Sequence, residues 1–100
     1  ATVVRQLLRM GANPNARGLN SGDTALLRAA FFGHVDTVRE LLEAGALVNQ
    51  ADAHETSPLM KASWYNRLEV VKLLLENGAV SSIHRRSVHG DTALSKAKEW

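Results

Sequence analysis

Aromatic side chains stand close to cations at two places in the chain and again at its end. The five aromatic residues are Phe31, Phe32, Trp64, Tyr65 and Trp100. One helical turn before each of these groups lies a cation, in order Arg28, Lys61 and Lys96. Trp, Tyr and Arg are enriched at binding hot spots, where they bury large areas or make several hydrogen bonds. The pattern therefore indicates recognition of another molecule.

Residues able to catalyse a reaction are scarce. The chain has no cysteine, which excludes disulfides, thiolate metal sites and thiol nucleophiles. A glycine-rich phosphate loop, a nucleophile elbow and a His-Glu-x-x-His pair are also missing from the sequence. His84 and His89 share a basic loop with Arg85 and Arg86, but their spacing matches no familiar zinc layout, and so short a basic run is usually solvated. We expect no enzyme activity, no metal and no cofactor.

Composition limits the kind of partner. Twelve Lys and Arg oppose ten Asp and Glu, and a formal charge of +2 does not indicate nucleic acid. The apolar runs are too short to span a bilayer, so no membrane partner is expected. With no cysteine and no signal-peptide layout, the chain fits an intracellular setting, either cytoplasmic or nuclear.

An internal repeat defines the elements that position these residues. The word Gly-Asp-Thr-Ala-Leu at 22–26 is echoed at 55–59 and 90–94, and a Gly-Ala word begins at Gly11, Gly45 and Gly78. The interval from the first word to the second is constant, whereas the return interval varies in length. Because insertions collect in loops, the constant piece is a rigid unit and the variable piece is a loop.

Each rigid unit predicts two short helices joined by a turn. Side chains able to cap the first helix of successive units are those of Thr24, Ser57 and Thr92. Gly33 and Asn66 tolerate the left-handed conformation that reverses the chain. Apolar residues then recur at helical spacing over 35–42 and 68–75. We expect these second helices to end in left-handed caps, at Gly45 and Gly78.

A unit of about 33 residues with this layout resembles the ankyrin repeat. The resemblance rests on the words at 24–27, 32–34, 57–60 and 73–79. It implies an all-α fold, an ankyrin-repeat solenoid of stacked antiparallel helix pairs with protruding loops. The family's Thr-Pro-Leu-His word lacks its histidine in all three copies, where Leu27, Met60 and Ser95 stand instead, and Glu55 replaces the usual loop glycine.

The resemblance divides one array, residues 1–100, into a partial repeat 1–18, whole repeats 19–52 and 53–86, and a partial repeat 87–100 that stops inside a first helix. Repeat arrays bury their faces against neighbours and carry polar terminal caps. We therefore expect a fragment of a longer array, with neighbouring repeats or a partner chain covering both ends.

Family members bind partners on a groove that includes the ends of the first helices, and this implies a set of contact residues here. They are Phe31, Phe32, Trp64, Tyr65 and Trp100, beside Arg28, Lys61 and Lys96. Alternatively, the aromatics fill the core between repeats and the cations are merely solvated. Against this, Leu, Val and Ala already fill the core positions, leaving no aromatic for the core, and aligned cations repel one another unless an anion is present.

The leading hypothesis is a protein-interaction module that binds a peptide or domain with acidic and apolar character. The alternative is a small anion or nucleotide, stacked on Trp64 or Trp100 and contacted by Lys61 or Lys96. A third hypothesis is that the chain serves purely as an architectural spacer. By analogy with the family, Asn15 or Asn49 is a candidate for hydroxylation.

Overall fold

The computed structural model describes residues 2–18 and 22–97 of the chain. Over these ranges the regular elements are the helices α1 (Thr2–Arg9), α2 (Ala25–Phe32), α3 (Val35–Glu43), α4 (Pro58–Trp64) and α5 (Leu68–Glu76), followed by a 3-10 helix η1 (Ala79–Ser82). No β-strand occurs in this part of the chain. The all-α prediction is confirmed.

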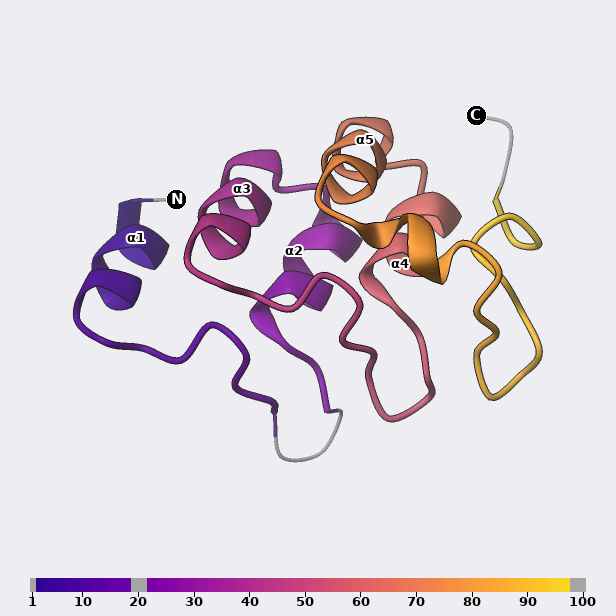
Figure 1. Cartoon of the computed structure of the whole chain (residues 1–100), viewed down its shortest axis with the longest axis horizontal. Helices are drawn as coiled ribbons and strands as arrows, with labels where there is room; N and C mark the ends of the chain where they lie inside the picture. The colour runs from indigo at the N-terminus through magenta and orange to yellow at the C-terminus, as the bar shows by residue number, and fades with distance from the viewer. Residues whose placement is uncertain (1, 19–21, 98–100) are drawn as a thin grey trace.

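The helices form two rows (Figure 1). α2 packs against α4 in one row, while α1, α3 and α5 pack in order in the other. Each of α3 and α5 also packs against the helix that precedes it, so α2 with α3 and α4 with α5 are antiparallel pairs. Long loops extend from one side of the array. This arrangement is the predicted solenoid of stacked helix pairs.

Local signals set the helix ends as the sequence predicts. The hydroxyls of Thr24 and Ser57 accept hydrogen bonds at 3.2 Å from the third backbone N–H beyond them, which caps α2 and α4. Gly33 has φ 75° and Asn66 has φ 56°, so both reverse the chain in the left-handed region. The short first helices α2 and α4 therefore end at their aromatic pairs.

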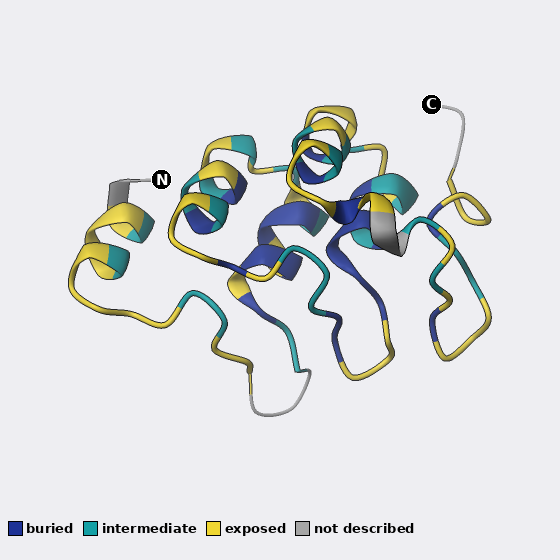
Figure 2. Ribbon diagram, viewed as in Figure 1, coloured by how far each residue is buried: buried dark blue, intermediate teal, exposed yellow. Residues whose placement is uncertain are grey.

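The core lies between the two rows of helices, where buried residues line the facing sides (Figure 2). Leu26, Leu41 and Leu74 are almost fully excluded from solvent. Leu27 and Met60, which stand at the positions of the missing histidines, are both 0% exposed. These two side chains therefore stabilise the fold by packing and not by a hydrogen-bond network.

The third copy of the first helix differs from the prediction. Thr92 Oγ1 accepts a hydrogen bond from the Ser95 amide at 3.1 Å, as a cap should. Residues 93–96 nevertheless form only turns, so the described part of this segment is not a helix. A capping bond fixes few backbone angles, and a helix needs a full turn plus tertiary packing to persist.

Candidate binding surface

Three aromatic rings meet across the boundary between two repeats. Phe31 and Phe32 end α2, and Tyr65 directly follows α4. The Phe31 ring contacts Phe32 at a centroid distance of 4.8 Å and Tyr65 at 4.5 Å, both edge to face. Phe32 is 50% exposed and Tyr65 is 44% exposed. We call Phe31, Phe32 and Tyr65 the aromatic patch.

Contacts made by the side chains of Arg67 and His34 hold the aromatic patch in place. Arg67 Nε donates to the Phe31 carbonyl at 3.0 Å, which joins the second repeat to the end of α2. The Arg67 side chain lies so close to Gly33 that an added Cβ there would be 2.8 Å from Arg67 Cδ. The His34 ring stacks on the Phe32 ring at a centroid distance of 5.9 Å. These contacts hold the end of α2 and the Phe32 ring against neighbouring side chains.

Trp64 differs from its neighbour Tyr65. It is partly buried and packs against the core cluster, and its Nε1 donates to the Thr92 carbonyl at 2.8 Å. Lys96 Nζ lies 5.0 Å from the centre of the indole ring. The expectation that no aromatic serves the core is thus wrong for Trp64, because its large ring also joins two repeats. Trp100 lies outside the described residues.

Each of the three aligned cations has a carboxylate beside it. The pairs are Arg28 with Asp23 at 3.9 Å, Lys61 with Asp52 at 3.4 Å, and Lys96 with Asp91 at 3.6 Å. The argument that aligned cations require an external anion is therefore wrong, since the chain supplies the anions itself. Whether these cations contact a partner stays a prediction. The side chains of Arg28 and Lys96 are 67% and 53% exposed, but that of Lys61 is only 19% exposed.

The Asp52 carboxylate is held by two backbone N–H groups and by Lys61. Burial alone would raise its pKa, but the backbone N–H groups of Thr56 and His54 and the ammonium of Lys61 outweigh burial and lower the pKa below its usual value of 3.8. Both N–H groups donate to Oδ1, at 3.0 and 2.9 Å, while Lys61 faces Oδ2. Asp52 is therefore ionised at neutral pH.

The sequence analysis missed these three carboxylates, although a signal was present. Asp23 and Asp91 belong to the repeated Gly-Asp-Thr word and precede their cations by the same interval. In the middle copy Thr56 takes that position, and Asp52 supplies the carboxylate from earlier in the loop. Ser87 stands where Asp52 does and accepts the same two kinds of backbone hydrogen bond.

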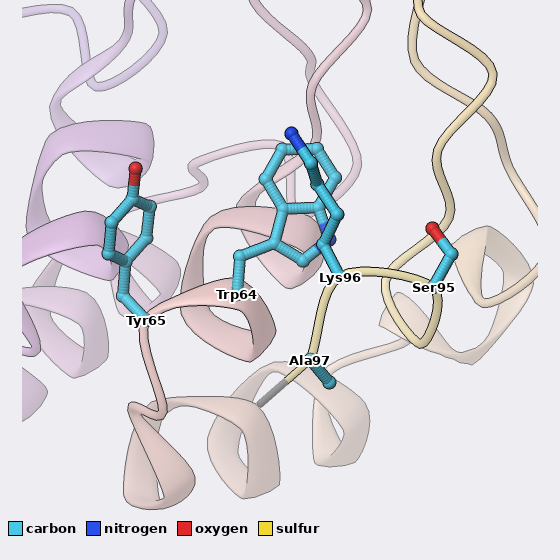
Figure 3. A pocket seen from close by; sticks show the side chains of 5 residues that line it. All are labelled: Trp64, Tyr65, Ser95, Lys96 and Ala97. Carbon is cyan, nitrogen blue, oxygen red and sulfur yellow. The ribbon is translucent and has the colours of Figure 1, made fainter. Parts of the chain in front are cut away.

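Two hollows lie beside these aromatic residues. The first, of about 200 Å³, is lined by Asp23, Leu27, Arg28, Phe31, Phe32 and Lys61. The second, of about 420 Å³, is lined by Trp64, Tyr65, Ser95, Lys96 and Ala97. Figure 3 shows the Trp64 and Tyr65 side chains rising from the end of α4, with Lys96 across the indole. Each hollow combines the aromatic pair of one repeat with the lysine of the next.

Elsewhere, the described residues contain no group of three or more His, Cys, Asp or Glu side chains that could hold a metal ion.

The side chains of the basic loop contact the preceding repeat. His89 stacks on His54 at 5.9 Å, while Arg85 donates to the Asn49 carbonyl and to Glu55. Glu40 pairs with Arg5 of α1 at 2.9 Å, and its side chain is only 10% exposed. No helix in the described ranges has the length and apolar character that crossing a membrane requires.

Comparisons with known proteins place this geometry in a family. The family model for ankyrin repeats (3 copies) matches residues 1–87. The chain is 42% identical over 57 residues to the E3 ubiquitin-protein ligase KEG of Arabidopsis thaliana, and 41% identical over 59 residues to the Neurogenic locus Notch protein of Drosophila melanogaster. These matches cover 57% and 59% of the chain but only 4% and 2% of the two relatives.

A solved structure agrees along nearly the whole chain. The ankyrin repeat domain of Bcl-3, a member of the IκB protein family, superimposes with a TM-score of 0.86 at 32% identity, covering 95% of this chain and 41% of that one. Ankyrin repeats are in general interaction modules for other proteins and not enzymes. The boundaries of the individual repeats stay a prediction. On the family match and the stacked helix pairs, this chain belongs to the ankyrin repeat family.

Proposed function

We propose that the face carrying the aromatic patch binds an extended segment of a partner protein. The observation that carries this proposal is the exposure of Phe32 and Tyr65, which are 50% and 44% accessible while touching the same third ring. Large contiguous apolar surface is disfavoured in water and is typical of binding sites. Trp and Tyr bury much area at low entropic cost when a partner covers them.

Rigid support favours binding at this face. The Arg67 bond to the Phe31 carbonyl and the left-handed turn at Gly33 fix the ends of α2 and α4 relative to each other. A partner therefore meets side chains that have already lost much of their freedom. Preorganisation of this kind lowers the entropy lost on association.

The proposed partner segment also carries carboxylates. Arg28 and Lys96 face their own aspartates at 3.9 and 3.6 Å, but both cations are more than half exposed. Exposed ion pairs contribute only about 0–1 kcal/mol, so a partner carboxylate is able to take over part of either pair at small cost. Lys61 is more enclosed and is better suited to positioning Asp52 than to exchange.

Surfaces at both ends support further contacts with neighbouring repeats or a partner chain. Leu7 of α1 is 53% exposed, whereas Leu41 and Leu74 at the equivalent positions are 1% and 0% exposed. At the other end Leu94 is 80% exposed, although its equivalent Leu59 is 3% exposed. Similar helices packed on these residues would remove both apolar surfaces from water. An intracellular location belongs to the same proposal.

The nucleotide alternative has weaker support. Lys96 already lies over the indole ring of Trp64, and the indole N–H is already bonded to Thr92. A base stacking on this ring would have to displace the lysine. An extended peptide can instead contact the parts of the Phe32 and Tyr65 rings that are already exposed, at 50% and 44%.

Affinity capture with matched baits tests the proposal. A Phe32→Ala/Tyr65→Ala bait removes the exposed part of the aromatic patch, and a Leu47→Ala/Val80→Ala bait removes equally exposed apolar residues elsewhere, at 58% and 63%. We expect proteins captured by the wild-type chain to be depleted at least tenfold from the first bait and retained by the second. Equal recovery on all three baits would place the binding surface elsewhere.

A further inference from the structure

We propose that Ser87 is a phosphorylation site, because the fold already holds an anion at the equivalent position one repeat earlier. Ser87 lies in the loop that follows η1 (Figure 1) and occupies the position that Asp52 has in the preceding loop. Two backbone N–H groups donate to each of these side chains. The inference does not depend on the binding function proposed above.

Asp52 shows which groups an anion meets at this position. Its Oδ1 accepts from the amides of His54 and Thr56 at 2.9 and 3.0 Å, and its Oδ2 lies 3.4 Å from Lys61 Nζ. Asp52 is only 8% exposed. Burial raises its pKa, but these three partners outweigh burial and hold the pKa below the usual value of 3.8. The fold therefore stabilises an ionised group at a loop position that is nearly buried.

Equivalent groups surround Ser87. Its Oγ accepts from the amides of His89 and Asp91 at 3.2 and 3.4 Å. Lys96 stands where the preceding repeat has Lys61. Here, however, the two amides meet a neutral hydroxyl in place of a carboxylate. A phosphate on Ser87 would bring close to two negative charges and three strong acceptor oxygens to these donors.

Two arginines directly before Ser87 favour recognition by a protein kinase with an acidic substrate groove. Arg86 is exposed, and Arg85 is partly exposed, with an ion pair to Glu55 at 2.7 Å. Charge patterns of this kind contribute to the choice of substrate by kinases. Ser95 is more exposed than Ser87, but no arginine or lysine directly precedes it. The sequence therefore favours Ser87 as the residue that such a kinase modifies.

A kinase reaches Ser87 when the loop opens, since this residue is only 6% exposed in the closed loop. Its neighbours Arg86, Val88 and His89 are exposed. Polar contacts tie the loop to the preceding one, among them the bond from the Val88 amide to the His54 carbonyl at 2.9 Å. Segments with few buried apolar contacts open at low free energy. Modification therefore requires a local opening and not the unfolding of the helices.

The phosphate comes from ATP bound to the kinase. Ser87 Oγ forms a bond to the γ-phosphorus, the bond from that phosphorus to its bridging oxygen breaks, ADP leaves, and the hydroxyl proton passes to a carboxylate of the kinase. After the loop closes, the phosphate competes with the Asp91 carboxylate for Lys96. That lysine now lies 3.6 Å from Asp91 and 5.0 Å from the centre of the Trp64 ring. Phosphorylation thus changes the charge beside the second hollow.

Incubation of the whole 100-residue chain with MgATP and a panel of arginine-directed serine kinases tests the proposal. We expect mass spectrometry to find phosphate on Ser87 and not on the more exposed Ser95. Ser87→Ala should abolish incorporation. Arg86→Gln should slow it about tenfold, as expected for one lost hydrogen bond to a charged group. Incorporation at Ser95 in place of Ser87, or no incorporation with any of the kinases, would overturn the proposal.

A second set of variants tests whether the closed loop accepts the charge. Ser87→Asp places the side chain of Asp52 at the equivalent position, and Ser87→Asn is the uncharged control of nearly the same shape. We expect Ser87→Asp to have the higher urea midpoint at pH 7, and we expect Lys96→Gln to reduce the difference. An equal or lower midpoint for Ser87→Asp would show that the loop rejects an anion and would overturn the proposal. Circular dichroism of each variant verifies that it is folded.

Discussion

Asp52 shows how one side chain can order a loop and the groove at once. Its carboxylate accepts hydrogen bonds from the amides of His54 and Thr56 and also faces Lys61, whose ammonium lies 6.0 Å from the Phe31 ring. The charge on Asp52 is therefore linked to the position of Lys61 beside the aromatic patch. The same charge makes stability depend on pH.

Lowering the pH should remove the contribution of Asp52 to stability. The folded chain holds the pKa of Asp52 below its ordinary value of 3.8, so its contribution is complete above about pH 4 and is lost as the pH falls through the folded pKa. We predict that wild type is more stable than Asp52→Asn at pH 7 and that the difference shrinks below pH 4. Urea unfolding from pH 3 to 7 measures this, and a constant difference across that range would contradict it.

Glu55 carries backbone strain that glycine would relieve. It has φ 60°, while its equivalents Gly22 and Gly90 have φ 69° and 82°, so all three copies require the left-handed region. Glu55→Gly should raise the free energy of unfolding by about 1 kcal/mol, offset by up to about 0.5 kcal/mol for the lost ion pair with Arg85. Glu55→Ala keeps the strain and should be slightly destabilising. A glycine variant no more stable than the alanine variant would refute the role of strain.

Among individual residues, the sequence predicts the position of the aromatics better than their roles. The family resemblance placed Phe32 and Tyr65 at the ends of the first helices, and the two side chains are 50% and 44% exposed. It did not reveal that Trp64 bonds to Thr92, because that contact depends on how two repeats stack. Nor did it reveal the partner of Lys61, since Asp52 lies in a loop whose path is set by backbone hydrogen bonds.

At the scale of elements, the short first helices α2 and α4 are capped by the side chains of Thr24 and Ser57. The helix α4 spans only Pro58–Trp64. The hydrogen bond from the Met60 amide to Ser57 Oγ gives a partner to one of the backbone N–H groups at the start of this short helix. We predict that Ser57→Ala lowers the free energy of unfolding by about 1 kcal/mol. Ser63→Ala, within the same helix, should change it by less than about 0.5 kcal/mol. Chemical denaturation compares the two, and equal effects would show that the cap contributes little.

The helices were the most predictable elements because their signals are local. Caps, left-handed turns and apolar spacing all lie within a few residues of the segments that they define, and α2 to α5 follow them. The segment after Thr92 has the same cap but forms only turns over residues 93–96. Its apolar face has less to pack against, as the 80% exposure of Leu94 shows, and local signals alone do not sustain a helix.

At the scale of the molecule, the stacking of repeats creates surface features that no single repeat has. The aromatic patch spans two repeats, each hollow joins residues of two repeats, and Arg67 links the ends of their first helices. The internal sequence similarity predicted the array, because the same motifs recur in each repeat. The shape of the face that two repeats form together depends on how their side chains pack against each other. The repeated motifs do not determine that packing.

Chemical-shift mapping tests the central claim of a binding face most directly. A partner segment obtained by capture would be added to ¹⁵N-labelled chain, and amide shifts would be followed during the titration. We predict the largest changes at Phe32, Tyr65 and Lys96 and at the indole N–H of Trp64, with little change near Leu47 and Val80. Changes concentrated at Leu47 and Val80, with the aromatic patch unaffected, would contradict the account.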